Sequence, residues 1–431
     1  LGGVVIVGSI AVAIAVVLLA PRDLHSAVEF AVDPGRLKAF AIAVAIGVVA
    51  WIAVVMTTYL MVRPLGVERW KTIGGGVVVG ALCLAVAAPV TIAAKYAMVE
   101  ADLVQTVFPE HVDSATTPQH VTADDPWGGR KRVNILLLGG DGGIHRIGVR
   151  TDSIILVSID TETGKAITFS LPRNMMYAQF PRKSPLHDLY PNGFGGEGDP
   201  GNWMLNAVYR EIPLLHPHVL GKSDNEGADA LKLAVQGSTG MKVDYYVLIN
   251  LSGFQQLVDA MGGVTVNINE PIAIGGRTDL GVPPTGYLQP GPKQHLDGWD
   301  ALWYTRGRYG SDDYQRMDRQ RCMINAIVDE ADPFTLLRRY QALAKASKDL
   351  VRTDIPRSLL PDFVDLALKM KDTRVKSVVF RSSDEFNPGD PNYDWMHETV
   401  DRALEAHNGT GHHKPKAEED SKNACAYHPV S

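Results

Sequence analysis

The chain has 431 residues, and its 48 acidic and 42 basic side chains give it a formal net charge of −6. This balance argues against a general nucleic-acid binder, and the length leaves room for two or three domains or for one large one. Hydrophobic residues make up 45% of the chain, but the long apolar runs lie in its N-terminal quarter and the remainder has the composition of a soluble domain.

Three runs in this N-terminal part are long and nearly free of charge: 2–20, 39–62 and 74–98. About 20 apolar residues cross ~30 Å of hydrocarbon, so each run predicts a transmembrane helix. The loops 21–38 and 63–73 contain equal numbers of Lys and Arg, so counting charges does not decide the orientation. The greater basic density of 63–73 favours a cytoplasmic location for that loop, which places everything after Met98 outside the cytoplasm. The sequence begins at Leu1 rather than at methionine, which leaves open whether residues precede it.

Residues 105–130 are rich in Pro, Thr, Asp and Gly and lack an apolar period, which predicts a linker. The soluble part then alternates between strand and helix patterns. Strands are predicted at 133–138, 153–160, 165–171, 243–250 and 264–269, with helices at 227–235 and 252–261. Because VNILLL at 133–138 is continuously apolar, that strand is expected to be covered on both faces. The alternation predicts an α/β or α+β sandwich around one sheet.

Beyond residue 330 the patterns are weaker. They predict helices at 333–351, 361–371 and 394–406 and a strand at 375–381. The organisation expected from these patterns is a membrane anchor at 1–104, a linker at 105–130, a soluble domain at 131–330, a helical extension at 331–406 and a flexible tail at 407–431.

The three cysteines have no spacing typical of a metal site. Cys83 lies in an apolar run and is expected to be a buried small side chain. Cys322 and Cys425 could form one disulfide if the soluble part lies outside the cytoplasm, and the sequence leaves this pairing open. The adjacent His412 and His413 have no partners at metal-ligand spacing, so they are expected to be solvated.

The stretch 303–321, WYTRGRYGSDDYQRMDRQR, contains five arginines, three aspartates and no lysine. A guanidinium group is a permanently charged planar fork that matches pairs of phosphate oxygens. At helical spacing, Arg316, Gln320 and Ile327 share one stripe, whereas Arg319 points about a quarter-turn away. The alternative interpretation is a solvated surface helix with salt bridges.

Arg306 and Arg308 precede this helical pattern and alternate as in a strand or an extended loop. Both side chains should therefore leave the same face of the backbone. Together with Arg316 and Gln320, they could converge on one anion.

Two aspartates lie at the ends of neighbouring predicted strands. Asp141 sits in a glycine-rich turn after the first strand, and Asp152 begins the next one. Two carboxylates at such positions could share one hard cation, because Mg²⁺ takes one or two carboxylates together with phosphate oxygens and water; alternatively, both aspartates only initiate turns. Arg150 is a competing ion-pair partner for Asp152. Arg173, at the end of the hairpin, would lie at the same edge of the sheet.

Several of these segments resemble one known family. They are NILLLGGDGG, VRTDSIILVSID, ITFSLPRNM, DYYVLINLSGFQQLVDAMGGVTVNI and HLDGWDALWYTRGRY followed by DYQRMDRQR. Together, in this order, they are similar to the LytR-CpsA-Psr family from residue 133 to 328. The resemblance implies a membrane-anchored, extracytoplasmic phosphotransferase that uses Mg²⁺. Such an enzyme moves a glycopolymer from a polyprenyl-pyrophosphate carrier to peptidoglycan and has no nucleic-acid partner.

The resemblance also assigns roles to individual residues and implies a central mixed sheet whose flanking helices enclose a lipid tunnel. The residues with implied catalytic roles are Asp141, Asp152, Arg173, Arg306 and Arg308, the first two as metal ligands. The residues with implied substrate-binding roles are Arg150, Arg316 and Gln320. The apolar side chains expected at the tunnel are Val247, Ile249, Phe254, Leu257 and Val258, with ordinary core packing as the alternative.

The first glycine-rich turn departs from the family pattern. Gly140 stands where the family has a hydroxyl residue, and Gly142 follows Asp141 where an arginine is expected soon after; Arg146 or Arg150 would substitute. Two other functions remain open, a polyprenyl-pyrophosphate hydrolase and a non-catalytic membrane sensor that binds polyprenyl phosphates. The sequence does not identify the glycopolymer, the acceptor or the general base.

Overall fold

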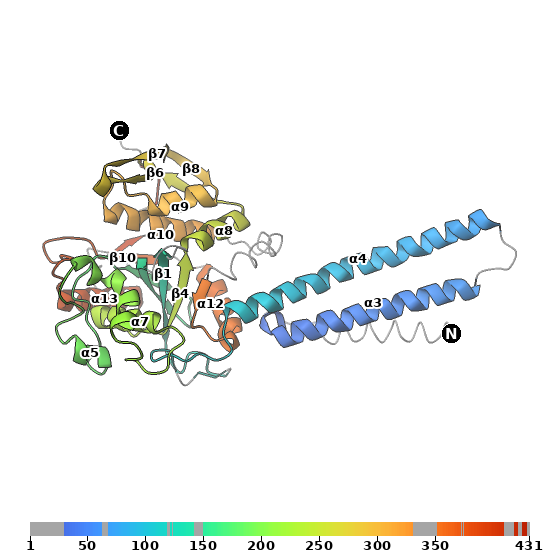
Figure 1. The fold of residues 1–431 in the computed structure, drawn as a ribbon, viewed down its shortest axis with the longest axis horizontal. Coiled ribbons are helices and arrows are strands. Elements are labelled where there is room, and N and C mark those ends of the chain that lie inside the picture. The colour runs from blue at the N-terminus through green and yellow to red at the C-terminus, as the bar shows by residue number, and fades with distance from the viewer. Residues whose placement is uncertain are drawn as a thin grey trace. The chain divides into compact units, whose positions relative to one another are not determined.

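The computed structural model describes residues 30–62, 68–118, 121–122, 124–141, 150–330, 351–371, 373, 375–408, 418–420 and 425–428. Two compact units make up the chain, 1–106 and 107–431, and their helices and strands are labelled in Figure 1. The second unit holds the sheet and the candidate site.

The N-terminal unit contains two long helices, α3 (Pro34–Val62) and α4 (Arg69–Val107). Each is long and apolar enough to cross a membrane. Apolar side chains remain exposed along both helices, for example Ile46 at 64% and Leu84 at 70%, as expected for helices that face lipid. The predicted spans 39–62 and 74–98 are therefore helices with wider bounds, and the predicted span 2–20 lies outside the described residues.

The second unit is built around one mixed seven-stranded sheet with the order β11-β10-β3-β2-β1-β4-β9. Its strands are β1 (Arg132–Asp141), β2 (Arg150–Asp160), β3 (Ala166–Ser170), β4 (Tyr245–Asn250), β9 (Val351–Thr353), β10 (Lys376–Val379) and β11 (Glu418–Asp420). β1 pairs antiparallel with β2 and parallel with β4. The predicted central sheet and the hairpin formed by β2 and β3 are confirmed.

Alternate residues of β1 face opposite sides of the sheet, as the pleat requires. Leu136 and Leu138 join a core with helices α5 (Pro185–Leu189), α6 (Val208–Leu215), α7 (Glu226–Thr239) and α13 (Tyr393–Asn408). Val133 and Ile135 pack on the other face with helix α12 (Leu360–Lys371). The continuous apolar run of β1 is thus covered on both faces, as predicted.

Two small sheets and three helices form a separate layer (Figure 1). The helices are α8 (Leu251–Met261), α9 (Gly298–Arg306) and α10 (Asp313–Glu330), and the paired strands are β5 (Val264–Ile268) with β8 (Gly291–Leu296) and β6 (Ile272–Arg277) with β7 (Val282–Leu288). Their shared core contains Cys322, which forms a disulfide with Cys425. This disulfide ties the C-terminal segment to α10.

The C-terminal part of the chain differs from the predicted helical extension and flexible tail. Helices α12 and α13 and strand β10 occur close to the predicted positions. However, β9 and β10 are strands of the central sheet, and β11, from the predicted tail, pairs with β10. Isolated three-residue strands have no readable period, which is why the sequence patterns missed β9 and β11. The predicted helix at 333–351 falls almost entirely on residues that the structure does not describe.

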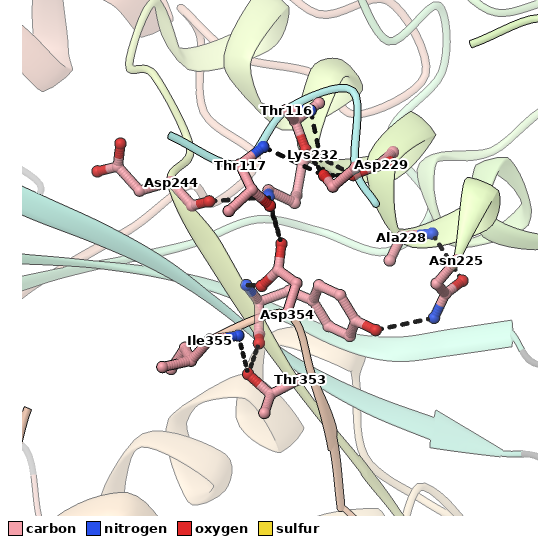
Figure 2. Close-up of polar contacts among 12 residues, drawn as sticks. Thr116, Thr117, Asn225, Ala228, Asp229, Lys232, Asp244, Thr353, Asp354 and Ile355 are labelled. Carbon is pink, nitrogen blue, oxygen red and sulfur yellow. Dashed lines mark hydrogen bonds and ion pairs between the residues drawn. The ribbon is translucent and has the colours of Figure 1, made fainter. Parts of the chain in front are cut away.

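Part of the predicted linker is docked on α7 through a buried polar network, shown in Figure 2. The Lys232 ammonium, fully buried, donates to Asp354 at 2.6 Å and to the backbone oxygen of Asp244 at 2.8 Å. The Thr117 hydroxyl donates to the same Asp354 carboxylate at 2.9 Å. Nearby, Asp229 accepts hydrogen bonds from residues 114–116. Because a buried charge is tolerated only when it is paired and hydrogen-bonded, this network holds 114–117 against the domain.

Candidate active site

A cavity of about 1090 Å³ lies between the central sheet and helices α8, α9 and α10. Apolar side chains from both sides line much of it: Leu137, Ile155, Val247, Ile249, Phe254, Leu257, Met323, Ile324, Ile327 and Val328. Four of the five apolar residues expected at a tunnel are in this set. The fifth, Val258, is fully buried in the core of the helical layer, where the alternative of ordinary packing holds.

Helix α10 contributes both polar and apolar side chains to the cavity. Arg316, Gln320, Met323, Ile324 and Ile327 all line it, and their spacing places them on one helical stripe. The predicted shared face of Arg316, Gln320 and Ile327 is therefore confirmed. The stripe is polar towards the N-terminus of the helix and apolar towards its C-terminus, so one cavity offers a cationic end and a hydrophobic end.

A β-bulge at the end of the sheet presents Asp152 to the cavity. Gly139 pairs with Ser153 and Gly140 pairs with Thr151, which leaves Asp152 as the extra residue. Such a bulge bends the strand and re-aims a side chain. A Cβ on Gly139 would lie 2.9 Å from the Ser153 hydroxyl, so glycine is needed for this close approach. Asp152 lines the cavity as a result.

Arg173 joins two carboxylates at the polar end. Its Nη1 lies 2.5 Å from Asp152 and its Nε lies 3.3 Å from Asp313. Asp313 also accepts from Arg316 at 2.9 Å. Sequence reasoning did not single out Asp313, although the pair of aspartates in GSDDYQR was a visible signal. Arg150, the competing partner considered for Asp152, instead donates to Asn202 at 2.8 Å.

The turn after α9 brings the other two predicted arginines to the cavity. Arg306 is the last residue of α9 and Arg308 follows Gly307, and both line the cavity. The expectation of an extended segment through Arg306 was wrong, because this residue ends a helix. A Cβ on Gly307 would lie 2.7 Å from the backbone oxygen of Ala273, so a residue without a side chain is required there. The Arg306 guanidinium lies 5.6 Å from the centre of the Trp303 ring, within the range of a cation–π contact.

Arg319 has a structural role instead. Its Nε donates to the backbone oxygen of Tyr304 at 2.8 Å, and its Nη2 donates to that of Gly307. These bonds hold the α9 turn on α10. The side chain is absent from the described cavity lining, in agreement with its predicted direction a quarter-turn from the Arg316 stripe.

The charge in the cavity is predominantly positive. Among the described lining residues, five arginines stand against two aspartates, an excess of three positive charges. Burial raises the pKa of Asp152, but the Arg173 and other nearby guanidiniums outweigh it and hold that pKa below its usual value. Burial and Arg173 lower the pKa of Arg308, yet an arginine side chain remains protonated in proteins. The arrangement therefore attracts an anion at neutral pH.

Two buried N–H groups at the cavity lack partners within the part of the chain that the structure describes. They are Nε of Arg316, a side chain only 3% exposed, and Nε1 of Trp303. A buried donor without an acceptor costs about 1–3 kcal/mol, so both are explained most directly by an acceptor-rich ligand. Asn206 also lines the cavity and is 4% exposed, and its Oδ1 has no partner among the described residues; no sequence pattern had marked it.

Of the two predicted magnesium ligands, Asp152 has a described side chain. Asp141 ends β1, and its backbone pairs with Arg150, but its side chain lies outside the described residues. Asp152 is ionised and Arg173 bonds one of its oxygens, so a cation would take the other. Among the described residues, no group of three or more acidic, His or Cys side chains could hold a metal. One or two carboxylates suit Mg²⁺, which completes its shell with phosphate oxygens and water.

Of the predicted site residues, all seven with described side chains line this one cavity: Arg150, Asp152, Arg173, Arg306, Arg308, Arg316 and Gln320. Their catalytic and binding roles remain predictions.

Comparison with known proteins identifies relatives of the chain. A family model, described as the LytR_cpsA_psr family, matches residues 100–408, so the similarity extends well beyond the segment 133–328 found in the sequence. The polyisoprenyl-teichoic acid–peptidoglycan teichoic acid transferase TagU of Oceanobacillus iheyensis is 32% identical over 227 residues, covering 52% of this chain and 59% of that protein. Biofilm regulatory protein A of Streptococcus mutans is 28% identical over 57% of this chain and 55% of its own length. The chain thus spans less than two thirds of the length of these relatives.

A solved structure of the LytR-CPS2A-psr family protein TagT with bound octaprenyl pyrophosphate lipid aligns with 20% identity, covering 70% of this chain and 99% of that chain, with a TM-score of 0.41.

Proposed function

The chain belongs to the LytR_cpsA_psr family, and from this premise we propose that it is an Mg²⁺-dependent phosphotransferase of cell-wall assembly. It would move a glycopolymer from a polyprenyl-pyrophosphate carrier to a hydroxyl group of peptidoglycan. The observation that carries the proposal is the single cavity with a guanidinium-lined end and an apolar end. A prenyl chain fits the apolar end, and a pyrophosphate fits the cationic end. The transferase name of the TagU relative supports the same reaction class.

The proposed location is the membrane, with the catalytic domain on its extracytoplasmic side. Helices α3 and α4 support a multi-pass anchor, because each is long and apolar enough to span the bilayer. The Cys322–Cys425 disulfide supports the orientation, because disulfides persist in oxidising compartments. Outside the cell no ATP is available, so a ligase must use a donor that arrives already activated, and a lipid-linked pyrophosphate is such a donor.

In the proposed reaction, the acceptor hydroxyl attacks the phosphorus that carries the glycan. A new P–O bond to the acceptor forms, the P–O bond to the lipid phosphate breaks, and polyprenyl phosphate leaves with that electron pair. Negative charge grows on the leaving oxygen and on the non-bridging oxygens. Arg308 and Arg316 line the cavity and would stabilise this charge. Arg173 would do so while held in place by Asp152 and Asp313. Such preorganisation is the main catalytic contribution in phosphoryl transfer.

When bound, Mg²⁺ would supply further neutralisation of the phosphate oxygens, with Asp152 and, as the family resemblance implies, Asp141 as its protein ligands. Arg150 and Gln320 would bind donor oxygens, because both lie in the same lining. The proton of the acceptor hydroxyl has to leave during the reaction, and the described residues include more than one group that could receive it.

The proposal is tested with the purified full chain in detergent, a lipid-linked glycan donor and peptidoglycan fragments. Transfer to the acceptor is expected with MgCl₂, to be lost with EDTA and to return when Mg²⁺ is restored. Release of free glycan phosphate at the same rate with and without acceptor would identify a hydrolase instead. Tight binding of polyprenyl phosphate without any turnover would identify a sensor.

A further inference from the structure

Two aromatic residues, Tyr177 and Trp203, lie on segments that adjoin the cationic end of the cavity, and neither is among its described lining residues. Tyr177 is 44% exposed and has a positive φ of 54°. Left-handed backbone is a genuine outlier for a bulky residue, and such strain persists mainly where function requires it. Among the described residues, His218 and Lys293 are the other non-glycine residues with positive φ.

The backbone before Tyr177 leads to the wall of the cavity. Residues 173–176 run antiparallel to 204–206, with the Asn206 amide donating to the Arg173 oxygen at 3.0 Å and a bridge between Met176 and Met204. Trp203 precedes Met204, and both aromatic rings lie against one glycine-rich loop. A Cβ on Gly195 would lie 3.5 Å from the Tyr177 ring, and a Cβ on Gly196 would lie 2.3 Å from the Trp203 ring. The residue before Trp203 is Asn202, which accepts the hydrogen bond from the cavity-lining Arg150. Trp203 is therefore adjacent in the chain to a residue that is bonded to the cavity lining.

The surroundings hold Tyr177 in its strained conformation and support one face of its ring. A Cβ on Gly193 would lie 2.1 Å from the backbone oxygen of Tyr177, so only glycine permits this packing. Gln179 donates to the same oxygen at 2.8 Å. The position of a Cβ on Gly195 is 3.5 Å from the Tyr177 ring, so backbone packs against part of the ring while the side chain stays 44% open to solvent.

We propose that Tyr177 and Trp203 form a platform that binds the sugar rings of the acceptor glycan. This inference rests on the proposed function, which requires an uncharged polyol to approach the pyrophosphate from outside the donor cavity. Sugar rings present C–H faces that pack on aromatic rings, and their hydroxyls donate to nearby acceptors. The carboxylates of Glu197 and Asp199 are exposed and could accept hydrogen bonds from these hydroxyls. At the cavity wall, Asn206 offers a further acceptor, because its Oδ1 has no partner among the described residues.

The experiment measures binding of a soluble, uncross-linked peptidoglycan glycan strand to the full chain in detergent by isothermal titration calorimetry. Tyr177→Asn removes the ring while keeping a residue that tolerates left-handed backbone, so the fold should survive, which thermal unfolding checks. About tenfold weaker binding is expected for this variant, whereas Tyr177→Phe should bind as the wild type does. Leu189→Ala is the matched control, because Leu189 on α5 is equally exposed at 44%.

Equal affinity of the wild type and Tyr177→Asn, equal weakening by Leu189→Ala, or no binding by the wild type would each overturn the platform. Binding of polyprenyl phosphate by the wild type is measured in parallel. A failure of that binding would count against the proposed function, independently of the glycan result.

Discussion

Replacing Arg308 by alanine should separate catalysis from stability. The side chain lines the cationic end of the cavity and is exposed, so its removal should change the free energy of unfolding by less than about 0.5 kcal/mol. A guanidinium that stabilises a phosphoryl-transfer transition state is worth ~10³-fold in rate or more, or about 4 kcal/mol of activation free energy. Transfer by Arg308→Ala should therefore fall at least ~10³-fold.

Arg319→Ala, on α10, is the matched control. Arg319 donates two charged hydrogen bonds to the backbone oxygens of Tyr304 and Gly307 and is absent from the described cavity lining. Its removal should lower the free energy of unfolding by about 3–6 kcal/mol, because two bonds are lost and each is worth about 1.5–3 kcal/mol. Thermal unfolding and a lipid-donor transfer assay, both on the full chain in detergent, measure the two effects. Turnover of Arg308→Ala within about tenfold of the wild type would refute the guanidinium site.

Three further predictions concern stability. The Lys232→Met variant leaves Asp354 buried and unpaired, so unfolding should become easier by about 3–5 kcal/mol, and adding Asp354→Leu should recover much of this loss in thermal unfolding. Loss of the Cys322–Cys425 disulfide, which closes a separation of 103 residues, should cost about 4 kcal/mol, seen as a lower Tm for Cys425→Ser; an unchanged Tm would contradict it. Asp152 has a folded-state pKa below the unfolded value of about 3.9, so its stabilisation is complete above that pH and disappears as the pH falls through the folded pKa. The stability difference between the wild type and Asp152→Asn should thus stay constant down to about pH 5 and shrink only below about pH 4, as acid titration of unfolding would show.

Sequence patterns predicted those elements in which similar side chains recur with the period of one helix or one strand. The apolar runs at 39–62 and 74–98 identified helices, and the run at 133–138 identified a strand covered on both faces. The 100° spacing on α10 placed Arg316 and Gln320 on one stripe before any contact was known. These properties depend on neighbours in sequence, so they can be read from sequence.

The pairings that complete the site are not local. Arg173 bonds Asp152 and Asp313, which are 21 and 140 residues away in the chain. Sequence alone suggested Arg150 as a partner for Asp152, because charge type does not encode distance. The strands β9 and β11 were missed for the same reason, since a three-residue segment becomes a strand only when a sheet edge is present to pair with it.

The sequence by itself determined the membrane-type helices, the two-faced central strand and the arginine-rich stripe, because each is a repeat of apolar or charged side chains along one element. The tertiary structure alone decided which carboxylate holds which guanidinium, that the C-terminal strands complete the sheet and that seven predicted residues share one cavity. The physical reason is that ion pairs, sheet edges and cavities arise between segments far apart in the chain, where only the folded geometry sets the distances.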